Sequence, residues 1–507
     1  MRIAVRAGRG GSSWGQRVAL LVALVAPAAA GEERFPELGV ALEPPPRYAI
    51  LPVPSNEPWV VLKYVAENRA RKGPQTRAIL ELVRIPWQPD PDPPPKVPPI
   101  NSVERYFEQR LKLWTIGASR AATRPKDGWE CQEMDVRWKS GQTGVGVWAY
   151  AQRNSEGTWL LIGRALQDEL EDEVKAWRRT AERLELFPPV PPKDSAKWTR
   201  FYEKNPQFQN PAVRLRIRAR LVDGWEAEDT ENYLWVTSTR KETLVAHLQK
   251  RLEGIRRAYV ERFPPAREIT AVPTVRLCQD QEEYHRYGGP TGTAGYWSPS
   301  AEELVLFVFE NDEGWQSGKE NSRSVMYHEG FHQYIHVAVG ELAPHSWFNE
   351  GYGDYFGGAN FTQTGKLGRI DPHPWRLGRI QDAIERGRHV SWSKMIRYTK
   401  EEYYGAERST NYAMGWSMIY FLEECRAAQK HPLWKKILPT YFETLKAAHF
   451  RQQERLAADG KDEDEEAVAK AAEAAREEAV KAAFDDVDLY AIEEAWREYV
   501  LELKGPR

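Results

Sequence analysis

Cysteine is scarce in this chain of 507 residues, which contains only Cys131, Cys278 and Cys425. They are widely separated and form no Cys-x-x-Cys pair, so the sequence predicts at most one disulfide and favours buried thiols. An excess of either charge is also missing, since the formal net charge is -2. This balance excludes the strongly basic surface that binds nucleic acid or an anionic membrane, and we expect neither as a partner.

Long hydrophobic runs are absent after the N-terminus. Residues 1–30 combine four arginines, an apolar run at 18–26 and the small residues Ala28, Ala29 and Ala30. This pattern is typical of a cleaved export signal. We therefore expect an exported protein, periplasmic, secreted or at the cell surface, with no stable membrane insertion after cleavage. An uncleaved anchor is the alternative.

Tryptophan, in contrast, is abundant, with 20 residues. Because the tryptophans do not cluster, they predict aromatic cores rather than platforms that stack on carbohydrate. A chain of this length can form two or three domains, each with its own core. The pattern of segments predicts the α+β class.

Residues 31–190 are predicted to form an accessory α+β domain. Strands are expected at 59–65, 78–85, 129–138, 144–152 and 158–164, and helices from Asn101 or Ser102 through Trp114 and over 169–186. This order predicts an antiparallel sheet with helices on one face. The region contains no chemical constellation, and a proline-rich stretch leads into a linker expected over 191–212.

A zinc-binding catalytic domain is expected over residues 213–375. Strands at 215–222, 233–239, 275–278 and 303–310, with a long helix at 241–263, predict a mixed sheet before the metal site. Residues 376–507 are expected to be mostly helical, with helices at 376–385, 391–404, 412–427, 432–447 and 487–503. The charged insert near 452–481 predicts an exposed helical excursion or a partly disordered segment.

The chemical signal is strongest at 328–332, which reads His-Glu-Gly-Phe-His. No proline interrupts residues 322–339, and Gly340 stands where a helix would end, so a helix is predicted across the motif. A spacing of four residues places His328 and His332 on one face, where both imidazoles can bind one metal ion. Glu329 is then placed to take a proton from a metal-bound water.

Zinc requires a third protein ligand, which the next segment can supply. Glu350 follows the turn at 340–344, and Asp354 lies four residues later. One carboxylate could bind the metal while the other orients a ligand histidine. Two ordinary packed helices are the alternative.

The histidine motif followed by Asn-Glu-Gly-Tyr-Gly-Asp at 349–354 resembles the gluzincins, the superfamily that includes thermolysin and the aminopeptidase N group. The resemblance implies the following roles: His328, His332 and Glu350 as zinc ligands, Glu329 as general base, and Asn349 and Asp354 as partners of the histidines. The linker between His332 and Glu350 is slightly shorter than in those relatives, which implies a different turn between the two helices.

Tyr412 is the expected second donor to the reacting oxygen. The segment from Asn411 resembles the aminopeptidase N helix that begins Tyr-x-Lys-Gly, because Tyr412 and Gly415 are kept while Met414 replaces the lysine. A phenol hydroxyl there can stabilise the negative charge that develops on the carbonyl oxygen. The rival donors are Tyr334, Tyr352, Tyr355, His336 and His345.

The resemblance also implies an edge strand that pairs with the substrate backbone just before the metal helix. Residues 304–309 are the expected edge strand, and an ordinary core strand is the alternative. The amine-binding Gly-x-Met-Glu-Asn motif of aminopeptidase N relatives is absent from 296–306. We therefore expect cleavage of internal bonds, although Glu302 or Glu303 could replace the missing glutamate.

The sequence thus predicts an exported zinc metallopeptidase of gluzincin type that acts on peptides or proteins. A non-catalytic peptide-binding or assembly module with a structural zinc site is the main alternative. A zinc hydrolase that acts on another kind of bond is a third hypothesis.

Overall fold

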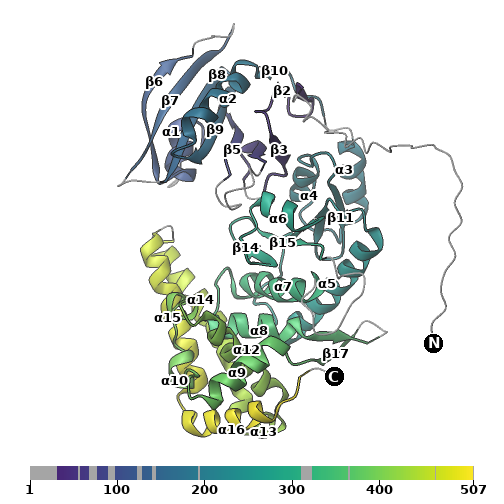
Figure 1. Ribbon diagram of the computed structural model, residues 1–507, viewed down its shortest axis with the longest axis vertical. Coiled ribbons are helices and arrows are strands. Elements are labelled where there is room, and N and C mark those ends of the chain that lie inside the picture. Colours follow the sequence, from purple (N-terminus) through teal and green to yellow (C-terminus); the bar gives the residue numbers. More distant parts are fainter. Residues whose placement is uncertain are drawn as a thin grey trace, which may run out of the picture.

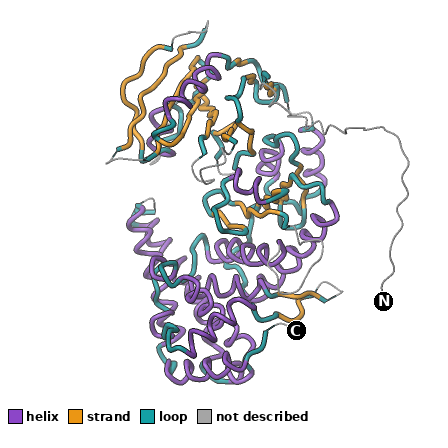
Figure 2. Tube along the Cα trace, viewed as in Figure 1, coloured by secondary structure: helices purple, strands orange, loops and turns teal. Residues whose placement is uncertain are grey.

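The computed structural model describes residues 31–505, except for the segments 55–56, 68–76, 90–97, 123–127, 140–143, 192–193, 310–321, 363–365 and 463. The expected export signal lies outside the described residues. Strands gather in the N-terminal part and helices in the C-terminal part (Figure 1, Figure 2), which confirms the α+β class. Among the described helices, none combines the length and the apolar character that a membrane span needs.

A seven-stranded antiparallel sheet forms the N-terminal part. Its strands, in spatial order, are β3 (Tyr48–Leu51), β4 (Val60–Ala66), β5 (Ile79–Pro86), β9 (Gly157–Leu166), β8 (Val145–Asn154), β7 (Glu130–Trp138) and β6 (Trp114–Ala121). A smaller sheet beside it contains β1 (Glu33–Phe35), β2 (Val40–Leu42) and β10 (Glu185–Leu186).

The two helices of this part cover opposite faces of the large sheet. Helix α1 (Val103–Arg110) shares a core with Leu160 and Ile162, whereas α2 (Leu170–Glu182) shares another with Leu161. The prediction of helices on one face is therefore wrong. The physical reason is that β9 is apolar at consecutive positions, so that both of its faces need cover.

A mixed five-stranded sheet precedes the metal motif, as predicted. Its order is β11 (Glu226–Asp229), β12 (Leu234–Thr237), β13 (Thr274–Cys278), β15 (Glu303–Phe307) and β14 (Gly295–Ser298). The three central strands run parallel, and the two outer strands are antiparallel to their neighbours. Helices α5 (Glu242–Arg262) and α6 (Gln281–Tyr287) connect the strands.

The edge strand next to the metal helix is β14, not residues 304–309. β15 lies between β13 and β14 and is buried at every position, which explains its apolar sequence. β14 is short and half-buried at three of its four positions, as suits an edge. The prediction of residues 304–309 as the edge strand is wrong.

The prediction of a strand at 215–222 is also wrong, because residues 211–218 form helix α4 (Pro211–Arg218). Charged and apolar residues alternate here, which imitates a strand. Arg214 and Arg218, one helical turn apart, both bind Asp229, at 2.6 and 2.5 Å. Helix α3 (Ser195–Lys204) and the start of α4 thus occupy the expected linker at 191–212.

Two helices carry the motif residues, α7 (Ser322–Val339) and α8 (Ser346–Gly357), followed by the hairpin of β16 (Ala359–Phe361) and β17 (Leu367–Ile370). The chain then becomes helical, with α9 (Pro374–Glu385), α10 (Trp392–Met395), α11 (Lys400–Tyr403), α12 (Arg408–Glu424), α13 (Arg426–Lys430), the 3-10 turn η3 (Trp434–Lys436), α14 (Ile437–Ala458), α15 (Glu465–Phe484) and α16 (Leu489–Glu502).

Two expectations for this helical part need comment. The single helix predicted at 391–404 is wrong: it is split into α10 and α11, because the Thr399 side chain and Glu402 form a capping box that starts a new helix. The end of α14 and most of α15 form the region near 452–481, and the two helices pack along each other. Because Ala475, Ala479 and Val480 of α15 are buried, the prediction of an exposed excursion is wrong for this face of the helix.

The core contains the residues that the sequence predicted to lie there. Six tryptophans are fully buried, namely Trp177, Trp235, Trp347, Trp392, Trp416 and Trp496. All three cysteines are buried free thiols. These findings confirm the predictions that tryptophans form aromatic cores and that the cysteines are buried thiols.

Helix α8 packs between α7 and α12, and two glycines permit the close approach. A Cβ on Gly351 would lie 2.6 Å from the carbonyl oxygen of Gly415 in α12. A Cβ on Gly353 would lie 2.9 Å from the imidazole of His328 in α7. The two glycines therefore allow α8 to lie close to both α7 and α12.

We predict that Gly351→Ala lowers the free energy of unfolding by about 1–3 kcal/mol, because the new methyl would overlap backbone that cannot rotate away. Urea unfolding measures this loss. Gly378→Ala in α9 is the control, since a Cβ there meets nothing within 4 Å. It should stabilise the helix by about 0.5–1 kcal/mol. A Gly351→Ala variant as stable as wild type would show that α8 and α12 can separate without cost.

Candidate metal centre

Helix α7 runs without a break through the histidine motif. The hydroxyl of Ser322 donates to the carbonyl of Phe307 (2.8 Å), which ties the helix start to the end of β15. Gly340, with φ 91°, ends the helix, and the N–H of Glu341 donates back to the carbonyl of His336 (2.7 Å). The histidines of the motif consequently share one face, as predicted.

His328, His332 and Glu350 form a group that could hold a metal ion. Their candidate ligand atoms all lie within 4.8 Å of one another. Glu350 Oε2 lies 3.2 Å from His328 Nε2 and 3.4 Å from His332 Nε2, and the two imidazole nitrogens are 3.0 Å apart. The packing of α7 on α8 thus brings the three predicted ligands together.

The outer nitrogens of the two imidazoles contact the residues that were predicted for them. His328 Nδ1 lies 3.1 Å from Asp354 Oδ1, and His332 Nδ1 lies 3.0 Å from Asn349 Oδ1. Such acceptors favour a proton on Nδ1 and leave the Nε2 lone pair for a metal. Arg376 of α9 binds Asp354 in turn, at 2.6 Å.

The charges of this group shift one another's protonation. Burial alone would lower the pKa of His328, but hydrogen bonds to Asp354 and Glu350 raise it well above its usual value. Burial would likewise raise the pKa of Glu350, but His332 and His328 hold it well below its usual value. Each imidazole and the carboxylate of Glu350 therefore stabilise the charged form of the other.

Glu329 contacts the edge strand of the mixed sheet. The backbone N–H of Trp297 in β14 donates to Glu329 Oε2 at 3.0 Å. The structure thus places the candidate base between the metal helix and the strand that borders it. The sequence analysis did not predict this contact, because a backbone donor leaves no mark in the residue types.

Tyr412, near the start of α12, lies beside the metal group. Burial and the charge of Glu350 raise the pKa of its phenol. The guanidinium of Arg376 lies 4.7 Å from its ring centroid. Its hydroxyl has no hydrogen-bond partner in the described part of the chain, so it is available to a ligand.

Most rival donors have other partners. Tyr334 donates to the carbonyl of Phe263 at 2.6 Å, and Tyr355 donates to Glu424 at 2.7 Å. Tyr352 donates to Glu423. The remaining rivals are His345, which is hydrogen-bonded to the Tyr441 hydroxyl at 2.9 Å, and His336, whose ring centroid lies 6.2 Å from that of Trp297.

The sequence analysis missed Tyr404, which contacts the centre directly. Its hydroxyl donates to Glu350 Oε1 at 2.5 Å, across a separation of 54 residues. No motif marks this tyrosine, and its neighbour Tyr403 would have been an equal choice. Arg376 was missed for the same reason.

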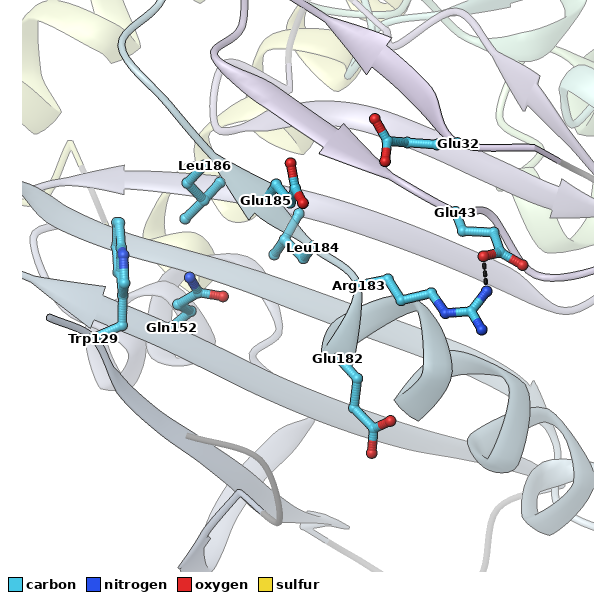
Figure 3. Close-up of a pocket in the computed structure, with 9 residues that line it drawn as sticks. All are labelled: Glu32, Glu43, Trp129, Gln152, Glu182, Arg183, Leu184, Glu185 and Leu186. Carbon is cyan, nitrogen blue, oxygen red and sulfur yellow. Dashed lines mark ion pairs between the residues drawn. The ribbon is translucent and has the colours of Figure 1, made fainter. Parts of the chain in front are cut away.

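A separate pocket of about 580 Å³ lies where α2 ends against β10 (Figure 3). Its charged lining residues are Glu32, Glu43, Glu182, Arg183 and Glu185. Arg183 pairs with Glu43, and Arg34 lies 3.6 Å from Glu32 and 3.9 Å from Glu185. Neither histidine nor cysteine belongs to its described lining, so its chemistry differs from that of the metal group.

One family model matches the part of the chain that contains the candidate centre. Residues 322–437 match the family model described as "Protein of unknown function (DUF1570)", a range that runs from α7 to the start of α14. No curated protein matches the chain.

Two solved structures have a remote similarity to the chain. The cyanobacterial PsbP (CyanoP) of Synechocystis sp. PCC 6803 is 12% identical, with 35% of this chain and 98% of that chain covered and a TM-score of 0.24. A protein from Bacteroides thetaiotaomicron VPI-5482 is 9% identical, with 39% and 81% covered and a TM-score of 0.19. Neither similarity supports an argument about fold or function.

We predict that the protein binds one divalent metal ion per chain and that Glu350→Ala raises its dissociation constant by about 10- to 100-fold or more, because two imidazoles then remain. Equilibrium dialysis followed by metal analysis measures this. Glu385→Ala, at the exposed end of α9, is the control and should bind as wild type does. Unchanged affinity in Glu350→Ala would remove Glu350 from the ligand set.

Proposed function

We propose that this chain is a zinc-dependent hydrolase of peptide bonds. The observation that carries the proposal is the convergence of His328, His332 and Glu350 in a group of three ligands. Structural zinc sites normally use four protein ligands, whereas catalytic sites use three and keep one position for water or substrate. Two imidazoles and one carboxylate are among the ligand sets of catalytic zinc.

The proposal assigns each side chain a role that its position allows. When bound, zinc supplies a Lewis acid that lowers the pKa of a coordinated water towards about 7 and polarises the carbonyl. Glu329 accepts the proton of the attacking water and delivers it to the leaving amine. Tyr412 donates its free hydroxyl to the oxygen on which negative charge develops. Asn349 and Asp354 keep both imidazoles in the binding tautomer.

The edge strand supports a peptide as the substrate. β14 borders the metal helix at the edge of the mixed sheet and holds Glu329 through Trp297. An extended peptide that adds to such an edge is bound through its backbone, so its scissile bond can lie beside the base whatever its side chains. The resemblance to gluzincins implies the same arrangement.

Contacts of Glu303 support cleavage of internal bonds. Its carboxylate is buried and bound to Arg276 at 2.8 Å and to the hydroxyl of Tyr287. Glu303 is therefore not available to hold a substrate amine, and Glu302 remains as the exposed alternative. We accordingly propose an endopeptidase, which the sequence of residues 1–30 would direct out of the cytoplasm.

We predict that Glu329→Gln lowers turnover about 10²- to 10⁴-fold, because the amide cannot accept the proton. The assay measures how fast the wild-type protein and the variant cleave a library of N-terminally blocked peptides, with and without a chelator. Metal content should stay at the wild-type level, since the ligands are intact. Glu302→Gln is the matched control and should cleave blocked peptides at the wild-type rate.

Two outcomes of this assay would contradict the proposal. A Glu329→Gln variant that behaves as wild type in every assay would indicate a structural zinc module. Wild-type protein that binds zinc but cleaves other bonds, and no peptide in the library, would indicate a hydrolase with another substrate.

We predict that Tyr412→Phe lowers kcat by about 100- to 1,000-fold, the usual cost of one donor to the developing charge. The ring and its packing are preserved, so zinc content and Tm should not change. Tyr490→Phe, at a side chain that is 86% exposed, is the control. A Tyr412→Phe variant within about threefold of wild type would assign the role to another donor.

A further inference from the structure

The two oxygens of the Glu350 carboxylate have different environments. Oε2 faces the imidazoles of His328 and His332, at 3.2 and 3.4 Å. Oε1 points to the other side and accepts the hydroxyl proton of Tyr404 at 2.5 Å. This distance is typical of a hydrogen bond between a hydroxyl and an ionised carboxylate, which is about twice as strong as a neutral one.

Tyr404 is itself held in place by the joint between α11 and α12. Thr399 and Glu402 close a capping box at the start of α11, with bonds of 3.2 and 2.8 Å. The buried amide of Asn411 donates to the carbonyls of Glu402 (3.2 Å) and Tyr403 (2.9 Å). Tyr404 follows directly, so its hydroxyl approaches Glu350 from an anchored backbone.

The same joint presents a second tyrosine with a different bonding state. Tyr412 directly follows Asn411, and its ring centroid lies 6.0 Å from that of Tyr404. The Tyr404 hydroxyl is engaged by the ligand carboxylate, whereas the Tyr412 hydroxyl has no partner among the described residues. The two neighbouring phenols therefore differ in whether their hydroxyls are already bound.

We propose that Tyr404 is a positioning residue, which holds Glu350 by Oε1 so that Oε2 stays directed at the two imidazoles. The inference rests on the proposed function, since it assigns the two tyrosines to separate tasks. Tyr404 positions the metal ligand Glu350, and Tyr412 donates its hydroxyl to the reacting oxygen of the substrate. Without this hydrogen bond, the Glu350 carboxylate can rotate about its side-chain torsions. Metal binding must then order this side chain as well.

The test compares Tyr404→Phe with Tyr412→Phe in the full chain. Zinc affinity is measured by competition with a chromophoric chelator. We expect the dissociation constant to rise about 10- to 100-fold in Tyr404→Phe and to stay at the wild-type value in Tyr412→Phe. Because the Tyr404 ring is 40% exposed and is kept, the metal-free variant should still fold, with a Tm lowered only by the loss of the hydrogen bond to Glu350.

A spectroscopic readout separates positioning from packing. Co²⁺ in place of zinc reports ligand geometry through its visible bands, and these should shift in Tyr404→Phe but not in Tyr412→Phe. At saturating zinc, Tyr404→Phe should keep kcat within about threefold of wild type. Unchanged zinc affinity and an unchanged cobalt spectrum in Tyr404→Phe would overturn the inference.

Turnover can also overturn it. A loss of about 100-fold or more in Tyr404→Phe at saturating zinc, with unchanged affinity, would make Tyr404 the donor to the substrate instead. The measurements of zinc affinity and of the cobalt spectrum need no substrate. They therefore remain informative if the wild-type protein cleaves no peptide. Failure of wild type to bind zinc at all would instead contradict the proposed function.

Discussion

The close packing of α7 on α8 is the constraint on which the candidate centre depends. A carboxylate from one helix lies 3.2 and 3.4 Å from two imidazoles of the other. That approach is possible because the residue facing His328 is Gly353, where a Cβ would come within 2.9 Å of the ring. The short linker between the helices is compatible with this geometry, since the ordered turn after Gly340 reverses the chain.

Bringing these groups together also buries charge, which is unfavourable unless each charge has a partner. Asp354 is 4% exposed and lies between His328 and Arg376. Glu350 is 6% exposed and lies between the imidazoles and Tyr404. A continuous line of partners therefore runs from α9 through α8 and α7 to the end of α11. The C-terminal helices complete the centre rather than merely supporting it.

The local part of this arrangement could be predicted from sequence. His328 and His332 are four residues apart on one helix, and Glu350 and Asp354 are four apart on the next, so helical periodicity fixes their faces. Tyr404 and Arg376 contact Glu350 and Asp354 across 54 and 22 residues. No periodicity connects such residues, because only the packing of the whole helical part brings them together.

The fold shows the same limit. The individual strands of the two sheets were mostly predictable, because each has its own apolar pattern. Strand order is a property of the whole sheet, so the pattern of residues 304–309 could not distinguish an edge from a centre. At Arg214 and Arg218, contacts with Asp229 outweigh an alternation that locally favours a strand.

The bond from Trp297 to Glu329 has a consequence for how this molecule can vary. Its donor is a main-chain N–H, so the identity of the side chain at that position does not enter the contact. Substitutions along β14 can change the shape and charge of the surface of this strand while the carboxylate of Glu329 stays anchored. Proline, which has no N–H, is the exception. The surface that β14 presents and the anchoring of the Glu329 carboxylate are thus separable properties of one short strand.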